Sequence, residues 1–130
     1  MGVGLTEHPQ TTRLRFVEEC AIVANQEVGP GHYRMRLHAP RMARVAVPGQ
    51  FCMLEVAEGF SPFLRRPMCF ERILPREVTI FYKVHGEGTA LLSRMIPGRF
   101  VSAQGPLGNG FPIDPNFDRH IIVAGGIGVA

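Results

Sequence analysis

The sequence predicts a mainly β fold, because composition and residue pattern both favour it. Fifteen glycines and eleven prolines in 130 residues are many for a helical protein and suit frequent turns between short strands. Residues 33–38 alternate apolar and polar side chains, which is the period of a strand with one face in solvent. With 45% hydrophobic residues, the chain can bury the core of one domain.

Six segments have the composition of strands, and the first five read as an antiparallel meander. The expected strands are residues 14–25, 33–38, 51–56, 66–73, 78–84 and 100–104. The third is apolar almost throughout, which implies burial on both faces, as in a barrel wall. Between the strands we expect a turn at 29–31, a loop with a brief turn over 40–48, a hairpin turn at 74–77 and a tight loop at 105–111.

One short helix is expected over residues 90–95, with Thr89 as its N-cap and Pro97 ending it. Gly86 and Gly88 precede this helix and allow two interpretations. The turn is either an anion site, since free N–H groups at a helix start point toward it, or a plain capped helix with loop glycines.

The last ten residues have a different pattern from the rest. Residues 121–124 form an apolar run typical of a buried parallel strand, and Gly125, Gly126 and Gly128 follow at once, as at the start of a nucleotide-binding unit. Such a unit needs about 30 residues, so we expect a truncated domain. The expected organisation is a disordered leader (1–12), a β-barrel domain (13–112), a linker (113–120) and the start of an α/β domain (121–130).

Charge and cysteine usage exclude several classes of function. The net charge of +3 comes from basic residues scattered along the chain, so no nucleic-acid interface is expected. Cys20, Cys52 and Cys69 are far apart and the five histidines show no ligand spacing, so we expect no metal site. Without a signal peptide or an apolar run of about 18 residues, we expect a cytoplasmic protein with no membrane span.

An apolar run around residue 66 is broken by two arginines and a proline. Pro67 cannot donate to a strand ladder, so the chain bends there or lies at a sheet edge. Arg66 is then free to face a ligand, and a guanidinium suits phosphate because it presents paired donors in one plane. The alternative is a solvated pair, Arg65 and Arg66, at a strand end.

Taken in order, these motifs resemble the electron-transfer subunits of dihydroorotate dehydrogenase B, within the ferredoxin-NADP reductase superfamily. The resemblance runs from about residue 14 to residue 130 and rests on Pro48-Gly49-Gln50-Phe51 and on residues 63–70, 81–89, 105–111 and 121–128. It implies a six-stranded antiparallel Greek-key barrel with one short capping helix that binds FAD. The first strand of an α/β nucleotide-binding domain would follow.

In this family the flavin signature reads arginine, proline, an aliphatic residue and serine, and here it is Arg66-Pro67-Met68-Cys69. The resemblance implies that Arg66 bonds the flavin diphosphate and that Pro67 and Met68 pack near the isoalloxazine. Cys69 stands where a hydroxyl usually faces the flavin N5. A thiol is a weaker donor, so any N5 contact should be weaker, and no other residue is expected to take part in catalysis.

The same resemblance assigns further cofactor-binding residues. They are Phe81, Tyr82 and Lys83 on the strand that contacts the flavin ring and ribose, Gly88 and Thr89 at the diphosphate-binding turn, and Gly125, Gly126 and Gly128 at the start of an incomplete NAD site. Tyr82 would be available to stack on the flavin, and Lys83 would add charge near a phosphate.

The implied function is that of an oxidoreductase subunit in pyrimidine biosynthesis. In this family, electrons pass from dihydroorotate through FMN on a catalytic partner subunit to a 2Fe-2S centre, then to FAD and to NAD. This chain would hold only the FAD step and would not act alone, because the cysteines for a 2Fe-2S cluster are missing. Two alternatives stay open: the flavin domain of a related ferredoxin or sulfide–NADP reductase subunit, and a non-redox β-barrel module that binds an acidic partner.

Overall fold

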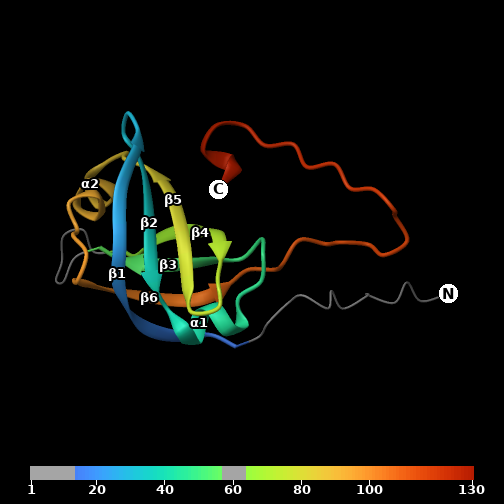
Figure 1. The fold of residues 1–130 in the computed structure, drawn as a ribbon, viewed down its shortest axis with the longest axis horizontal. Helices are drawn as coiled ribbons and strands as arrows, with labels where there is room; N and C mark the ends of the chain where they lie inside the picture. Colours follow the sequence, from blue (N-terminus) through green and yellow to red (C-terminus); the bar gives the residue numbers. More distant parts are fainter. Residues whose placement is uncertain (1–13, 57–63) are drawn as a thin grey trace.

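Six strands close into one antiparallel barrel in the computed structural model, which describes residues 14–56 and 64–130 (Figure 1). The strands are β1 Phe16–Gly29, β2 His32–His38, β3 Phe51–Glu55, β4 Arg66–Ile73, β5 Glu77–Lys83 and β6 Phe100–Leu107. The helices are α1 Pro40–Val45, α2 Glu87–Ser93 and a 3-10 turn, η1 Gly126–Val129. The barrel prediction is confirmed, whereas the predicted leader lies outside the described residues.

Around the barrel the strand order is β1-β2-β5-β4-β3-β6, and all neighbours are antiparallel. The predicted meander is correct for the pairs β1–β2, β3–β4 and β4–β5 but wrong for β2 and β3, because β2 pairs with β5 instead. The reason is that the chain between β2 and β3 crosses one end of the barrel, where α1 forms (Figure 1). This crossing gives the Greek-key connection.

The core fills the inside of the barrel, and strand alternation selects its residues. On β2, Met35 and Leu37 are fully buried while Arg34 and Arg36 are exposed. Leu92 of α2 is also fully buried, which seats this helix on the barrel. Each such apolar side chain contributes about 1.5–3 kcal/mol on burial.

Helix α1 lies where a loop was predicted, so the barrel has two short helices against it instead of one. The carboxylate of Glu18 on β1 accepts the backbone N–H groups of Arg41 (3.0 Å) and Met42 (2.8 Å) at the start of α1. These are the orphan donors of a first helical turn. The residue that satisfies them lies on another element, so the local signals, Pro40 at the first position and the expected brief turn, do not by themselves predict a helix.

Helix α2 begins at Glu87, earlier than predicted, and its N-cap is Gly86 rather than Thr89. The Thr89 hydroxyl instead pairs with the backbone of His85: Oγ1 accepts from the His85 N–H at 2.6 Å and donates to the His85 carbonyl at 2.9 Å. The N-cap prediction is therefore wrong, because Thr89 stabilises the turn from inside the helix. Gly86 has φ +82°, a conformation that favours glycine.

Strand β6 extends through residues predicted to form a tight loop. Gly105 pairs with Phe16 and Leu107 with Phe51, so the strand runs on to Leu107 and helps to close the barrel. A Cβ on Gly105 would lie 3.2 Å from the Cβ of Cys52, so this position permits a close approach of β3 and β6.

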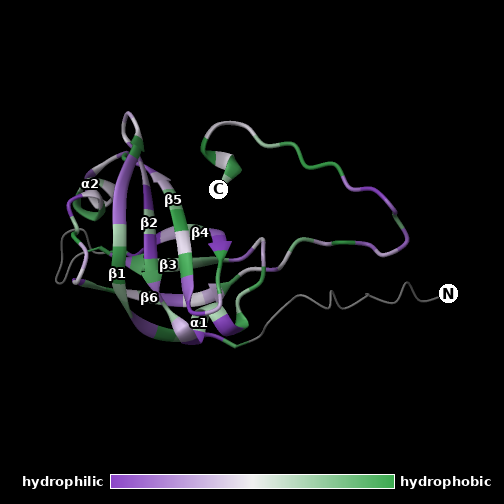
Figure 2. Ribbon diagram, viewed as in Figure 1, coloured by the Kyte–Doolittle hydropathy of each residue, from purple (hydrophilic) through white to green (hydrophobic). Residues whose placement is uncertain are grey.

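The strand predicted at residues 121–124 does not form. Ile121, Ile122 and Val123 are 85–91% exposed, and Figure 2 shows this apolar stretch outside the barrel. A parallel strand needs a neighbour with which to form a ladder, and the described residues provide no open sheet for it. In Figure 1 the chain leads away from the barrel after β6 and then turns, and this segment lies on the returning part, which ends with η1 near β5.

Within residues 14–56 and 64–130, the helices α1, α2 and η1 lack the length and the apolar character that crossing a bilayer would require.

Candidate functional site

Two residues predicted to bind the same diphosphate lie against each other in the fold. Arg66 begins β4, and Gly88 lies in the first turn of α2. A Cβ built on Gly88 would lie 2.5 Å from Nε of Arg66 and 3.0 Å from its Cζ, so only glycine leaves room for this side chain. Nη1 of Arg66 donates to the Leu64 carbonyl at 2.6 Å, which holds the guanidinium in place.

The neighbouring Arg65 has a different role, because its guanidinium ties three strands together. Its Nη2 donates to Oε2 of Glu55 on β3 (2.6 Å) and to Oγ of Ser102 on β6 (3.0 Å). Its Nη1 donates to the Ser102 carbonyl at 3.1 Å. The alternative of a solvated arginine pair is therefore wrong for Arg65, which fixes the backbone just before Arg66.

Strand alternation divides the flavin signature between two faces. Pro67 and Cys69 are exposed on the outer face of β4, whereas Met68 is buried inside the barrel at 7% exposure. The outer face can therefore offer a ligand Pro67 and the thiol of Cys69 but not the Met68 side chain. The other two cysteines are in the core, where burial raises the pKa of Cys20 to about 12 and that of Cys52 well above its ordinary value.

Phe81 lies on the outer face of β5 and its ring is held by two neighbours from β2. The His32 ring stacks on it with centroids 6.0 Å apart, and Cζ of Arg34 lies 5.6 Å from its centroid. Arg34 also forms two hydrogen bonds with the Glu71 carboxylate, Nε to Oε2 at 2.8 Å and Nη2 to Oε1 at 2.6 Å. Hydrogen bonding and charge attraction from Glu71 raise the pKa of Arg34. Lys83 is exposed at the end of the same strand.

Tyr82 does not lie on this face. Only 3% of it is exposed, its hydroxyl donates to Oδ1 of Asn25 at 2.9 Å, and its ring stacks on Tyr33 inside the barrel with centroids 5.6 Å apart. Burial raises the pKa of Tyr82 to about 12. The prediction that Tyr82 stacks on a flavin therefore chose the wrong side of the strand, and Phe81 is the aromatic residue on the outer face.

The three C-terminal glycines of the predicted NAD site lie at or beside η1 and are exposed. No atom lies within 4 Å of a Cβ built on Gly125, Gly126 or Gly128. The described part of the chain therefore forms no phosphate cradle around them. In the same part, no group of three metal-binding side chains comes together.

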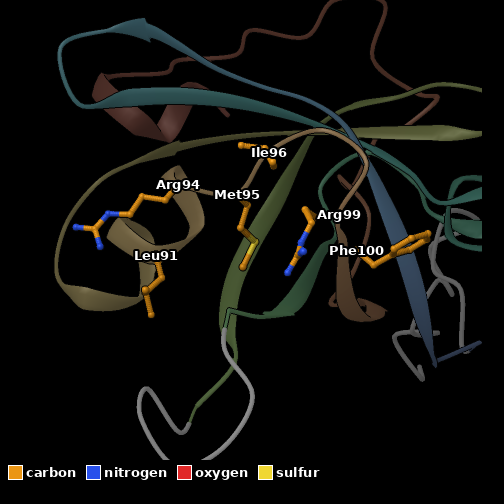
Figure 3. A pocket seen from close by; sticks show the side chains of 6 residues that line it. All are labelled: Leu91, Arg94, Met95, Ile96, Arg99 and Phe100. Carbon is orange, nitrogen blue, oxygen red and sulfur yellow. The ribbon is translucent and has the colours of Figure 1, made fainter.

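Hollows lie both beside and away from the predicted flavin residues. One of about 240 Å³ is lined in part by Arg34, Glu71, Arg72 and Thr79 of β2, β4 and β5. Another of about 370 Å³ lies between α2 and the start of β6, and its lining residues are Leu91, Arg94, Met95, Ile96, Arg99 and Phe100 (Figure 3). Arg99 points between Met95 and Phe100, while Arg94 points away from them (Figure 3). None of these is a predicted flavin residue. We therefore locate the candidate site at the contact of Arg66 with Gly88 and on the adjoining outer face of β4 and β5.

Three features of the structure were not predicted from the sequence. They are the bonds of the Asn25 amide, the structural role of Arg65 and the ion pair of Arg34 with Glu71. Each of these side chains bonds an element distant in sequence. The sequence carries no local signal for such contacts.

Most of the chain aligns with curated proteins of related sequence. No protein-family model matches the chain. The chain is 39% identical over 116 residues to the electron transfer subunit of dihydroorotate dehydrogenase B (NAD(+)) from Geobacillus thermodenitrificans, which covers 86% of this chain and 45% of the relative. The subunit of the same name from Desulforamulus reducens is also 39% identical over 116 residues, covering 88% of this chain and 44% of the relative. The chain thus spans less than half the length of these curated relatives.

Solved structures share the barrel. The NADH-dependent reduced ferredoxin-NADP oxidoreductase, a protein of flavin-based electron bifurcation, is 26% identical with a TM-score of 0.66 over 71% of this chain and 33% of its own. The ferredoxin reductase of carbazole 1,9a-dioxygenase is 21% identical with a TM-score of 0.71 over 88% and 36%. The chain is therefore a homologue of the dihydroorotate dehydrogenase B electron-transfer subunits and folds as the barrel found in ferredoxin reductases.

Proposed function

We propose that this chain binds FAD as part of the electron-transfer subunit of an NAD-linked dihydroorotate dehydrogenase. The observation that carries the proposal is the contact of Arg66 with Gly88, since the family resemblance assigns both to one diphosphate. The name of the curated relatives and the barrel common to ferredoxin reductases support it.

Each residue of the outer face has a role in this proposal. The Arg66 guanidinium pairs with the diphosphate, and Gly88 leaves the space that this requires. Pro67 and Cys69 face the ring system from β4 and Phe81 faces it from β5. FAD, when bound, supplies the electron transfer. The protein supplies a fixed cation and an apolar surface that excludes water.

The electron route of the whole subunit extends beyond this chain. In the proposal, electrons come from FMN on a catalytic partner subunit through a 2Fe-2S centre and leave through FAD to NAD. The proposal assigns the 2Fe-2S centre and the rest of the NAD site to a part of the subunit outside this chain, which spans 45% of the relative's length. Three free cysteines suit a reducing compartment, so we place this step of pyrimidine biosynthesis in the cytoplasm.

Titration with FAD tests the proposal, followed by quenching of flavin fluorescence and by visible absorbance. We expect saturable binding by the parent chain and binding at least about tenfold weaker by Arg66→Ala, since a charge-assisted contact to phosphate is lost. Arg44→Ala is the matched control, because Arg44 is an exposed arginine on α1, which is no part of the candidate site. A folded parent that binds no FAD, even when extended to the length of its relatives, contradicts the proposal.

A second candidate is the flavin part of a related ferredoxin–NADP reductase subunit. It is favoured by the 26% identity to the reduced ferredoxin-NADP oxidoreductase. Copurification distinguishes the two, because only the first predicts a catalytic partner that carries FMN.

The non-redox binding module predicts a chain that binds no flavin and therefore never turns yellow. Its binding to polyanions should fall steeply with salt.

A further inference from the structure

Asn25, near the end of β1, uses its side-chain amide to join three parts of the fold. Nδ2 donates to the carbonyls of Leu92 and Met95, both at 2.9 Å. Oδ1 accepts the Tyr82 hydroxyl at 2.9 Å. Both N–H groups are thus used and the oxygen faces a donor, so the amide has a single orientation in this partly buried place.

Two partners of Asn25, Tyr82 and Leu92, belong to elements of the candidate flavin site, and the third, Met95, lies two residues past the end of α2. Tyr82 lies on β5 between Phe81 and Lys83. Leu92 lies in the last turn of α2, and the first turn of this helix holds Gly88 against Arg66. The Leu92 carbonyl also accepts the backbone N–H of Met95 at 3.1 Å, so Asn25 adds a side-chain bond from another element to the C-terminal end of α2.

We infer that Asn25 is a positioning residue for the flavin site: it fixes α2 relative to β5, and with them the diphosphate-binding turn relative to the outer face that meets the ring. This inference rests on the proposed function. Leu92 also anchors α2, but apolar burial is not directional. Hydrogen bonds have a preferred distance and angle, so the Asn25 amide sets where the helix lies along the barrel.

Tyr82 takes a new role in this arrangement, in place of the stacking predicted for it. Burial raises its pKa to about 12, so its hydroxyl keeps its proton at neutral pH and donates to Asn25. The aromatic ring stacked on Tyr33 holds that hydroxyl in place.

Three variants of the full chain test the inference by FAD titration and amide hydrogen exchange of α2. Asn25→Asp keeps the shape of the side chain but replaces the amide NH2, which donates to two carbonyls, by a carboxylate oxygen that cannot donate to them. We expect FAD binding about tenfold weaker at pH 8, with faster exchange in α2, and partial recovery toward pH 6 as the carboxyl gains a proton and can donate once. The parent should show no such recovery. Asn25→Leu should weaken binding at both pH values, and Tyr82→Phe by about threefold.

Met42→Ala is the control for lost stability, since Met42 is fully buried in α1 and belongs to no part of the candidate site. We expect it to lower the unfolding midpoint as Asn25→Asp does but to bind FAD like the parent. Equal weakening in both variants would overturn the inference and leave Asn25 with a structural role only. If Asn25→Asp binds FAD as tightly as the parent while Arg66→Ala binds it more weakly, the inference is overturned and the proposed function stands.

Two further outcomes are decisive. If the Asn25 variants do not fold, Tyr82→Phe decides, because it removes one hydrogen bond and no apolar contact. Unchanged FAD binding by Tyr82→Phe would then overturn the inference. If the folded parent binds no FAD at all, the proposed function fails first and the inference fails with it.

Discussion

Arg65 and Arg66 show how the environment decides what a residue does. The two are adjacent and chemically identical, yet Arg65 bonds the partly exposed side chains of Glu55 and Ser102 while Arg66 lies over Gly88. The sequence predicts Arg66 as a ligand-binding residue from the proline that follows it. It does not reveal that Arg65 is structural, because its partners lie on β3 and β6.

Gly88→Ala tests the contact that carries the proposed function. The new Cβ would lie 2.5 Å from Nε of Arg66, so the guanidinium must move, and we expect FAD binding about tenfold weaker with little loss of stability. Gly29→Ala is the control, because its Cβ would meet no atom within 4 Å. Flavin titration and thermal unfolding measure both effects. Unchanged FAD binding by Gly88→Ala would contradict a shared diphosphate site.

The three cysteines should differ sharply in reactivity. Cys69 is exposed, while Cys20 and Cys52 are buried and their raised pKa values keep them as neutral thiols. An aromatic disulfide reagent at pH 8 should therefore modify one thiol per folded chain, and FAD should slow that reaction. Cys69→Ser should abolish it. Rapid modification of a second thiol would show that the barrel opens.

The free energy of unfolding should fall at alkaline pH, because Cys20 and Tyr82 bind their protons more tightly in the folded chain than in the unfolded chain. Folding raises the pKa of Cys20 from 9.0 to about 12 and that of Tyr82 from 10.0 to about 12. Their stabilising contribution is full below about pH 9 and is lost as the pH rises toward 12. The urea midpoint should therefore drop between pH 9 and 11, and less so in Cys20→Ala. Identical slopes for both chains would contradict the role of Cys20.

At the scale of elements, strand positions were predictable and strand faces were less so. Strand β5 contains Val78, Ile80 and Tyr82 on one side and Thr79, Phe81 and Lys83 on the other. Both sides carry an aromatic residue, so the pattern does not reveal that Phe81 faces outward. In β2, by contrast, every second residue is charged or histidine, and the predicted face is correct.

Gln50 joins two loops at the start of β3, and this accounts for its burial. Its Oε1 accepts the Val47 N–H at 3.0 Å, and its Nε2 donates to the Gly108 carbonyl at 2.9 Å. Gln50→Leu leaves both backbone groups without their partner, so we expect a loss of about 2–4 kcal/mol in urea unfolding. Gln104→Leu on the exposed face of β6 should change stability by less than about 0.5 kcal/mol. Equal losses in the two variants would contradict this role.

At the scale of the whole molecule, the barrel and the C-terminal segment should differ in resistance to proteolysis. Residues 111–129 are exposed and contain no strand, and Arg119 lies among them. Trypsin should cleave after Arg119 first and leave a barrel that unfolds at the same temperature. Arg119→Gln should block that cleavage. Resistance to several proteases throughout residues 113–130 would contradict an open segment.

The fold class follows from composition and the spacing of strands, and the pairing of Arg66 with Gly88 follows from the family resemblance. What could not be predicted depends on contacts between distant residues: the Glu18 cap of α1, the Asn25 bridge to α2 and the choice of β5 as the partner of β2. The strand expected at residues 121–124 failed for a related reason, because a strand forms only where a neighbour offers a ladder.

Closure of the barrel by β1 and β6 has a consequence for synthesis on the ribosome. β1 ends at Gly29 and β6 begins at Phe100, so 71 residues (100 − 29) must be added before β1 meets its second partner. At roughly 5–20 residues per second, this takes about 4–14 s. During that time the longest strand of the molecule presents one unpaired edge, to which any other extended chain nearby can add.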